Sequence, residues 1–399
     1  MRTLHVGRYV IAATTARMVA EGTAITLVLL GDDRELGHAA LGVLVASWTL
    51  PQMLTAPLIG SWADRSAHPA RLLACLVAVG GLGIGAVGAG LGAVPIALLA
   101  IAAALISLAE PAIMGALSGI ATRSAPPSSR FEAWDAVSYG AAGIVAQVVV
   151  ATSAAFGDPM TTLVVLVVLA ALAAGLVASL PLRAASIEHP DGPRAGARAA
   201  MRVAFVDRDL RSMTVLTTVS MSAFGGLALV AVDLAEHAGR EAGAASRLIL
   251  AMAVGAVVGS LAWTRFAPPE RPLRTAVCSV TTVGLAFATC AFGNWWVCLG
   301  AFLVAGVADA PLLVATFTTR NRRSPDHLRA SVYTVSASLK IAATSVGAVA
   351  VGLLVGARSG VSGPLTLTAL QLIALAAFAV SRQGPQPDRA RASARDIHV

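Results

Sequence analysis

Charged residues are scarce in this sequence. Asp, Glu, Lys and Arg make up 13% of its 399 residues, whereas a soluble domain of ordinary composition has roughly 25%. A soluble chain of this length with so few charges could not cover its own apolar core with polar surface. A soluble globular fold is therefore excluded.

Residues that carry common metal and cofactor chemistry are also few. The four cysteines show no Cys-x-x-Cys spacing, and because they lie within or beside apolar runs we expect buried free thiols: Cys75, Cys278, Cys290 and Cys298. All seven histidines fall outside the apolar runs. The glycines at 83, 85 and 88 have dinucleotide-fingerprint spacing, but no strand precedes them. The sequence thus predicts no catalytic residues, no metal site, no cofactor and no enzyme.

The sequence does contain apolar runs of membrane-spanning length. A helix of about 20 residues crosses a hydrocarbon core of roughly 30 Å. No segment alternates as a barrel strand does, and helices satisfy their own backbone in lipid. Twelve spans are predicted, at 9–30, 39–60, 72–93, 95–121, 132–156, 159–181, 213–235, 245–264, 273–292, 294–318, 330–356 and 362–381.

The net charge of +8 is distributed unevenly between the two sides of these spans. Apart from Arg17 and Lys340, which lie well inside the spans, only Arg34, Arg240, Arg247 and Arg358 fall on one side, and all other basic residues fall on the other. Basic loops stay in the cytoplasm, so both termini are expected there and the first span is expected to remain uncleaved. The basicity thus indicates topology and attraction to anionic lipid, and not nucleic-acid binding.

The two halves of the chain resemble each other at an offset near 200 residues. Glu110, Arg123 and Arg130 have counterparts 199 positions later, namely Asp309, Arg322 and Arg329. Thr14–Gly22 similarly aligns with Thr217–Gly225, and Gly60–Ala63 with Gly259–Ala262. Internal repeats of this kind are typical of secondary transporters.

The repeat predicts four segments. We expect a six-helix bundle at 1–181, a cytoplasmic linker with an amphipathic segment at 182–212, a second bundle at 213–382 and a disordered cytoplasmic tail at 383–399. Within the linker, residues 194–211 are expected to form an interfacial helix, with a regulatory lipid-binding role as the alternative.

The loop after the second span carries a recognisable motif, Gly60-Ser-Trp-Ala-Asp64-Arg65-Ser-Ala-His-Pro-Ala-Arg71. It resembles the loop motif of the major facilitator superfamily, and the resemblance extends over the whole chain. It implies an all-α membrane protein with twelve transmembrane helices in two pseudo-symmetric six-helix bundles around a central cavity. It also implies that Gly60, Asp64, Arg65 and Arg71 form a cytoplasmic gate.

Some charged residues lie inside the predicted spans, where each charge costs on the order of 3 kcal/mol unless it is paired, hydrated or functional. The five that lie well inside the spans, away from their ends, are Arg17, Glu21, Glu110, Asp309 and Lys340. We expect Arg17 to interact with Glu21 and Glu110, and Lys340, the only lysine of the chain, to be a switchable partner of Asp309. The alternative is that they form static ion pairs that fix helix packing.

Other polar and aromatic residues in the spans are weaker candidates. Gln52, Ser220 and Phe224 are predicted to orient a substrate, with helix packing as the alternative. Asp135 and Asp233 lie near span ends and are expected at the membrane interface rather than in coupling.

These features predict a secondary transporter in a bacterial cytoplasmic membrane. It would move a small polar, zwitterionic or weakly cationic molecule by alternating access, most simply as a monomeric, proton-coupled antiporter that exports drugs or metabolites. Two alternatives stay open: proton-coupled uptake of a small polar nutrient, and a membrane sensor that no longer transports.

Overall fold

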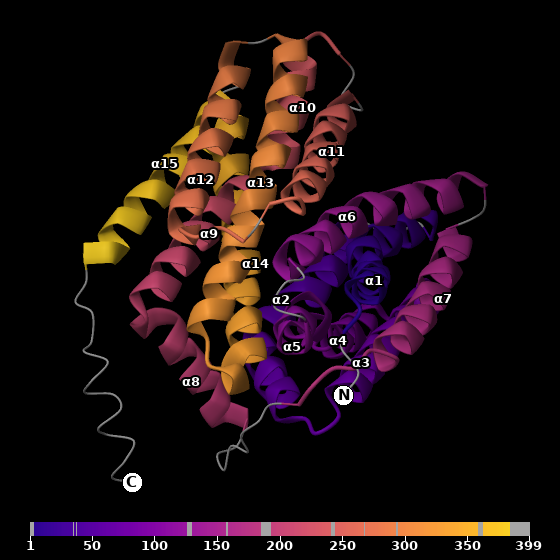
Figure 1. The fold of residues 1–399 in the computed structure, drawn as a ribbon. Helices are drawn as coiled ribbons and strands as arrows, with labels where there is room; N and C mark the ends of the chain where they lie inside the picture. Colours follow the sequence, from indigo (N-terminus) through magenta and orange to yellow (C-terminus); the bar gives the residue numbers. More distant parts are fainter. Residues whose placement is uncertain are drawn as a thin grey trace. The chain divides into compact units, whose positions relative to one another are not determined.

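The computed structural model describes residues 4–34, 36, 38–125, 130–156, 159–184, 193–240, 244–266, 268–292, 294–357 and 362–383. All regular secondary structure in these ranges is helical (Figure 1). The predicted tail at 383–399 lies almost wholly outside the described residues. The predicted fold class is therefore confirmed as all-α.

Each predicted span in the first half coincides with one helix, except the fourth. The helices are α1 (Val6–Asp33), α2 (His38–Arg65), α3 (Pro69–Gly90), α4 (Ile96–Ser107), α5 (Leu117–Ser124), α6 (Phe131–Phe156) and α7 (Pro159–Ala178). A π-helical turn at Ala112–Ala116 separates α4 from α5. It directly follows Pro111, which has no N–H to donate to the preceding turn. The backbone is thus irregular next to Glu110.

The second half has the same pattern with its own irregularity. Its helices are α8 (Pro193–Val206), α9 (Arg208–Gly225), α10 (Leu227–His237), α11 (Ala245–Trp263), α12 (Pro272–Thr289), α13 (Trp295–Arg323), α14 (Arg329–Ala357) and α15 (Ser362–Gln383), with short 3₁₀ turns at Cys290–Phe292 and Asp326–Leu328. The predicted span at 213–235 is divided into α9 and α10, which meet at a 45° bend beside Gly226. Pro311, by contrast, lies inside the unbroken α13.

The predicted interfacial helix is shorter than expected. It forms α8 but ends at Val206, because Asp207 accepts hydrogen bonds from the backbone N–H groups of Asp209 and Leu210. An Asp in this position caps the start of a new helix. The chain therefore begins α9 at Arg208, three residues before the predicted end of the interfacial segment.

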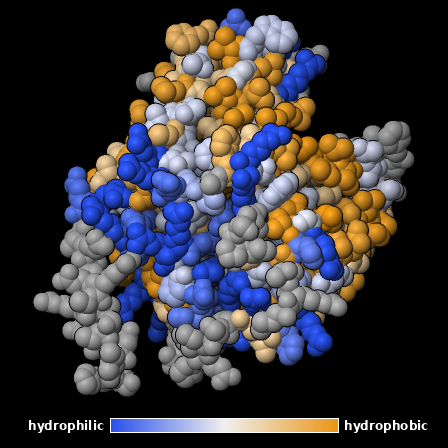
Figure 2. Space-filling model, viewed as in Figure 1, coloured by the Kyte–Doolittle hydropathy of each residue, from blue (hydrophilic) through white to orange (hydrophobic). Residues whose placement is uncertain are grey.

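Among the described residues, seven helices are long and apolar enough to cross a membrane, or eight if α9 and α10 form one span. Their outward faces are apolar: in α7, Val164, Val168 and Leu172 are exposed at four-residue intervals. Figure 2 shows hydrophobic side chains gathered over this helix. The chain is thus a multi-pass helical membrane protein, and the number of twelve spans stays a prediction.

The described chain forms two compact units. One comprises Met1–Ala197, Ala256–Ala267 and Asp326–Leu339, and the other comprises Arg198–Gly255, Pro268–Pro325 and Lys340–Val399. In the first unit α3 packs along α7 and α1 along α6, and in the second α12 packs along α13 and α9 along α15 (Figure 1). The boundaries of the two predicted bundles stay a prediction.

The cysteine expectation is half right. Cys290 and Cys298 are buried, but Cys75 and Cys278 are exposed. The exposed pair lies on outward faces of α3 and α12, where a bilayer rather than protein would cover an apolar side chain. All four are free thiols, as expected.

Candidate functional site

Arg17 lies at the centre of a buried polar cluster between α1, α5 and α6. Its guanidinium forms an ion pair of 2.9 Å with Asp135, and both side chains are at most 1% exposed. It also donates hydrogen bonds to the hydroxyls of Ser118, at 2.7 Å, and Ser138. Tyr9 donates a 2.6 Å hydrogen bond to the same Asp135 carboxylate. A full charge is thus held inside the bundle by one opposite charge and several hydrogen bonds.

Tyr139 connects this cluster to the irregular turn next to Glu110. The Arg17 guanidinium carbon lies 3.6 Å from the centroid of the Tyr139 ring, an arrangement that attracts a cation to the π face. The Tyr139 hydroxyl donates to the backbone carbonyl of Met114, inside the π-helical turn. The irregular backbone is therefore tied to the same cluster as the buried arginine.

This cluster changes the expected partner of Arg17. The sequence indicates Glu21 and Glu110, but the structure places the guanidinium on Asp135, which was expected at the membrane interface. Glu21 is within electrostatic range of Arg17 without a direct ion pair. The reason is helix rotation: Asp135 in α6 faces α1, and sequence spacing within α1 alone cannot reveal a partner 118 residues away.

Glu110 forms a second polar cluster with residues of α1 and α2. Gln52 donates from its amide nitrogen to the Glu110 carboxylate and also, at 2.8 Å, to the backbone carbonyl of Trp48. The Trp48 side chain also lies beside Glu110. Glu21 lies near enough for its charge to act on Glu110. Two carboxyl groups from different helices thus face the same region of the first unit.

Glu21 and Glu110 differ in their exposure. Glu110 is half-buried, and Trp48 and Gln52 beside it are buried, whereas Glu21 is exposed. Because α1 is predicted to span the membrane, an exposed carboxyl group near its middle is stable only next to water or a polar ligand. The arrangement therefore has one sheltered and one accessible carboxyl group.

The predicted pair in the second unit is brought into electrostatic range. Lys340 on α14 lies within electrostatic range of Arg320 and of Asp309, both on α13, although no direct ion pair joins Lys340 and Asp309 in the described residues. Ser220 donates a 2.7 Å hydrogen bond to Gln371 of α15. Phe224 packs edge-on against Phe287, with ring centroids 6.4 Å apart. The contacts of Ser220 and Phe224 thus join one helix to another. Such contacts fit the alternative role, helix packing, that the sequence leaves open for these residues.

Asp64 holds the start of α14 in the first unit. Its carboxylate accepts hydrogen bonds from the backbone N–H groups of Ala330, at 3.0 Å, and Ser331, at 2.8 Å, and from the Ser331 hydroxyl at 2.7 Å. It also forms an ion pair with Arg123 of α5. An acidic side chain at a helix N-terminus satisfies free N–H groups and interacts favourably with the helix dipole.

Gly60 lets α2 approach α14 closely beside this acid. A Cβ atom at Gly60 would lie 2.1 Å from the Thr334 hydroxyl oxygen and 2.7 Å from the Ser331 Cα atom. A Cβ at Gly119 of α5 would similarly lie 2.7 Å from the Ala330 Cα atom. Only glycine fits at these crossings. Of the other two predicted gate residues, Arg65 ends α2, and Arg71 is exposed in the first turn of α3.

No family model matches this sequence, and no curated protein matches it. Solved structures do match. The human organic anion transporter MFSD10 (TETRAN) superposes with a TM-score of 0.76 at 14% identity, covering 94% of this chain and 99% of that one. A bacterial homologue of the iron transporter ferroportin, in an outward-facing state, superposes at 0.75 and 14%, covering 96% and 100%.

A third match is a named member of the major facilitator superfamily. The major facilitator superfamily proton:xylose symporter XylE superposes with a TM-score of 0.69 at 12% identity, covering 93% of this chain and 94% of that one. These three are transporters and not enzymes. The chain is thus a polytopic helical membrane protein. It has the fold of the major facilitator superfamily, as the loop motif predicts.

Proposed function

We propose that this protein is a proton-coupled secondary transporter of small organic molecules. The observation that carries the proposal is the presence of Glu21 and Glu110 in the same region. The positive charge near them, Arg17, is already paired with Asp135. Because Asp135 forms the ion pair with Arg17, that arginine does not neutralise the two glutamates fully. A carboxyl group sheltered as Glu110 is, with a second carboxyl group in electrostatic range, requires a proton or an external cation.

The charges in the spans favour a cationic or zwitterionic substrate. The acids well inside or buried in the spans are Glu21, Glu110, Asp135, Asp233 and Asp309, and the bases are Arg17 and Lys340. A substrate amine could replace the proton on Glu110, with Gln52 and Trp48 orienting it. Proton release on substrate binding is the exchange that an antiporter needs, so we propose export of a drug or metabolite as the direction.

The Asp64 contacts supply the gate for alternating access in this proposal. Asp64, Gly60 and Arg123 keep the start of α14 against α2 and α5. Breaking three hydrogen bonds and an ion pair would release α14 and open a path to the cytoplasm. The remaining features of the proposal are a monomer in a bacterial cytoplasmic membrane, with both termini in the cytoplasm.

Uptake is the second candidate function, because a structure of similar fold is described as a proton:xylose symporter. In a symporter the proton and the substrate would occupy the first unit together. Glu110 would then bind the proton while Gln52 and Trp48 contact a neutral polar substrate. The two candidates differ in the direction of proton movement when substrate is added.

Dye-monitored proton movement in everted membrane vesicles tests the proposal. Vesicles are acidified inside and given organic amines, amino acids and neutral sugars in turn. We expect an amine to release protons, seen as fluorescence dequenching, in the wild type but not in Glu110→Gln. The matched control is Glu236→Gln, the same chemical change at an exposed position on α10.

The direction needs a second assay in intact, de-energised cells. A symporter substrate added outside would make the medium alkaline as protons enter with it, whereas an antiporter substrate would not. If folded wild-type protein gives no response to any compound in either assay, or if Glu110→Gln responds as the wild type does, the proposed coupling site is wrong.

A further inference from the structure

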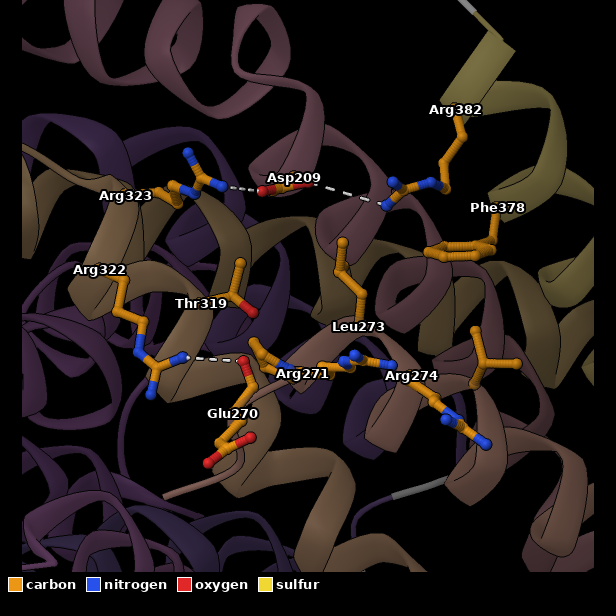
Figure 3. Close-up of a pocket in the computed structure, with 12 residues that line it drawn as sticks. Asp209, Glu270, Arg271, Leu273, Arg274, Thr319, Arg322, Arg323, Phe378 and Arg382 are labelled. Carbon is orange, nitrogen blue, oxygen red and sulfur yellow. Dashed lines mark hydrogen bonds and ion pairs between the residues drawn. The ribbon is translucent and has the colours of Figure 1, made fainter. Parts of the chain in front are cut away.

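A pocket of about 550 Å³ lies in the second unit, among the ends of four helices. It is bounded by the starts of α9 and α12 and by the ends of α13 and α15 (Figure 3). Figure 2 shows hydrophilic residues gathered around the lower end of α12, in contrast to its apolar upper part. The pocket is separate from the Glu21 and Glu110 site and is not used by the proposed transport cycle.

Arginines dominate the pocket wall. Three of the five are engaged: Arg323 and Arg382 both pair with Asp209, and Arg322 donates to the backbone carbonyl of Glu270 at 3.3 Å. The other two, Arg271 and Arg274, are exposed and have neither a hydrogen bond nor an ion pair from their side chains to another described residue. In Figure 3 the Glu270 carboxylate and the Arg274 guanidinium point to opposite sides. The pocket thus has two available guanidinium groups.

The start of α12 adds a partial positive charge to the same place. Arg271 is the N-cap residue of α12 and makes no side-chain capping hydrogen bond, and Pro272 occupies the first turn. A helix N-terminus carries roughly half an elementary positive charge. Pro272 has no N–H and the Arg274 N–H donates to the Arg271 carbonyl at 3.0 Å, so the start of α12 contributes mainly its partial charge. Together with two free guanidinium groups, this charge attracts a phosphate.

The rest of the wall is apolar. Leu273 and Val277 of α12 face the pocket together with Phe378 of α15, and the Arg382 guanidinium lies 5.7 Å from the Phe378 ring centroid. Further along α12, Leu285 is 63% exposed on an outward face that a bilayer would cover. The charged part of the pocket therefore lies where an apolar, lipid-facing helix begins, at the level expected for lipid headgroups.

We propose that this pocket binds a phosphate group attached to an apolar chain, with Arg271 and Arg274 contacting the phosphate beside the start of α12 and Phe378 contacting the chain. The headgroup of an anionic phospholipid in the cytoplasmic leaflet has this chemistry. A soluble organic phosphate shares the charged part of it. The apolar wall favours the lipid.

Binding to the detergent-purified full-length protein tests the proposal. Native mass spectrometry with short-chain phosphatidylglycerol, short-chain phosphatidylcholine and glycerol 3-phosphate separates the two sources. We expect phosphatidylglycerol to bind more tightly than either of the others. The variant Arg271→Gln/Arg274→Gln should bind it roughly 10- to 30-fold more weakly, because two contacts to an anionic group are lost.

The matched control removes the same charge elsewhere on the predicted cytoplasmic side. Arg202→Gln/Arg265→Gln changes two exposed arginines outside the pocket and should bind phosphatidylglycerol as the wild type does. Phe378→Ala should weaken phosphatidylglycerol but leave glycerol 3-phosphate unchanged. Size-exclusion profiles verify that each variant is folded.

Two results would identify the ligand as a lipid or as a soluble phosphate, and two others would rule out a phosphate site in this pocket. Tight binding of phosphatidylglycerol alone, lost in the pocket variant, identifies a lipid site. Equally tight binding of glycerol 3-phosphate, also lost in that variant, identifies a soluble phosphate as the ligand. Equal losses in the pocket and control variants, or no preference of the wild type for phosphatidylglycerol over phosphatidylcholine, show that no phosphate site exists here.

Discussion

Substitution of Asp135 by Asn gives the most direct test of the buried cluster around Arg17. The Arg17 side chain has no exposed surface and that of Asp135 is 1% exposed, so the change leaves a guanidinium charge inside the bundle without its counter-charge. Breaking a buried pair from one side costs about 3–5 kcal/mol. We expect Asp135→Asn to lower the free energy of unfolding by that amount.

We expect the decrease in the free energy of unfolding to come from the unpaired charge of Arg17 and not from the lost contact. A double variant, Arg17→Met/Asp135→Asn, removes both charges and should regain most of the stability, because a buried ion pair replaced by apolar groups is often close to neutral. The exposed pair of Arg34 and Asp33, 43% and 48% exposed, provides the matched control. Asp33→Asn should change stability by less than about 0.5 kcal/mol.

The assay is the free energy of unfolding in mixed micelles, titrated with a denaturing detergent and followed by tryptophan fluorescence. The reasoning would be refuted if Asp135→Asn were as stable as Asp33→Asn. It would also be refuted if the double variant were no more stable than the single one. Transport by the double variant then shows whether the cluster only stabilises the fold or is also needed for transport. If it only stabilises the fold, the double variant transports normally once the protein is stable.

Three further changes test the gate and the coupling site. Asp64→Ala leaves the first N–H groups of α14 without acceptors, so hydrogen exchange at 330–331 should become at least roughly tenfold faster than in the wild type. Gly60→Val places a Cβ within 2.7 Å of the α14 backbone and should impair transport, whereas Gly80→Val, where nothing lies within 4 Å, should not, as vesicle assays can show. Gln52→Leu removes a donor to Glu110 and should shift the pH at which transport is half-maximal, and an unchanged pH profile would exclude a role for this hydrogen bond.

The fold class could be predicted from the sequence because it depends on local chemistry. A run of about 20 apolar residues in lipid has to form a helix to satisfy its backbone, whatever its neighbours are. The loop motif around Asp64 similarly indicated the fold that the solved structures share. The irregular backbone next to Glu110 was predictable too, since Pro111 removes a hydrogen bond wherever the helix packs.

The partners inside the bundle could be predicted only in part. The matched positions of Asp309 and Glu110 in the two halves indicated where acids lie in the spans, and the pairing of Asp309 with Lys340 stays a prediction. The pairing of Gln52 with Glu110 connects residues 58 positions apart, and no pattern within either helix specifies it. Spacing along one helix shows which residues share its face, but not which helix that face meets.

By itself, the sequence determined that this chain is a helical membrane protein with a few charges inside its spans, and it predicted two repeated halves and a basic cytoplasmic side. Only the tertiary structure decided that Arg17 is neutralised by Asp135 rather than by Glu21 or Glu110. It also decided that the ends of α9, α12, α13 and α15 meet around a basic pocket. The physical reason is the same in both cases. Helix formation depends on hydrogen bonds between residues four apart, whereas ion pairs and pockets depend on how each helix is rotated against its neighbours.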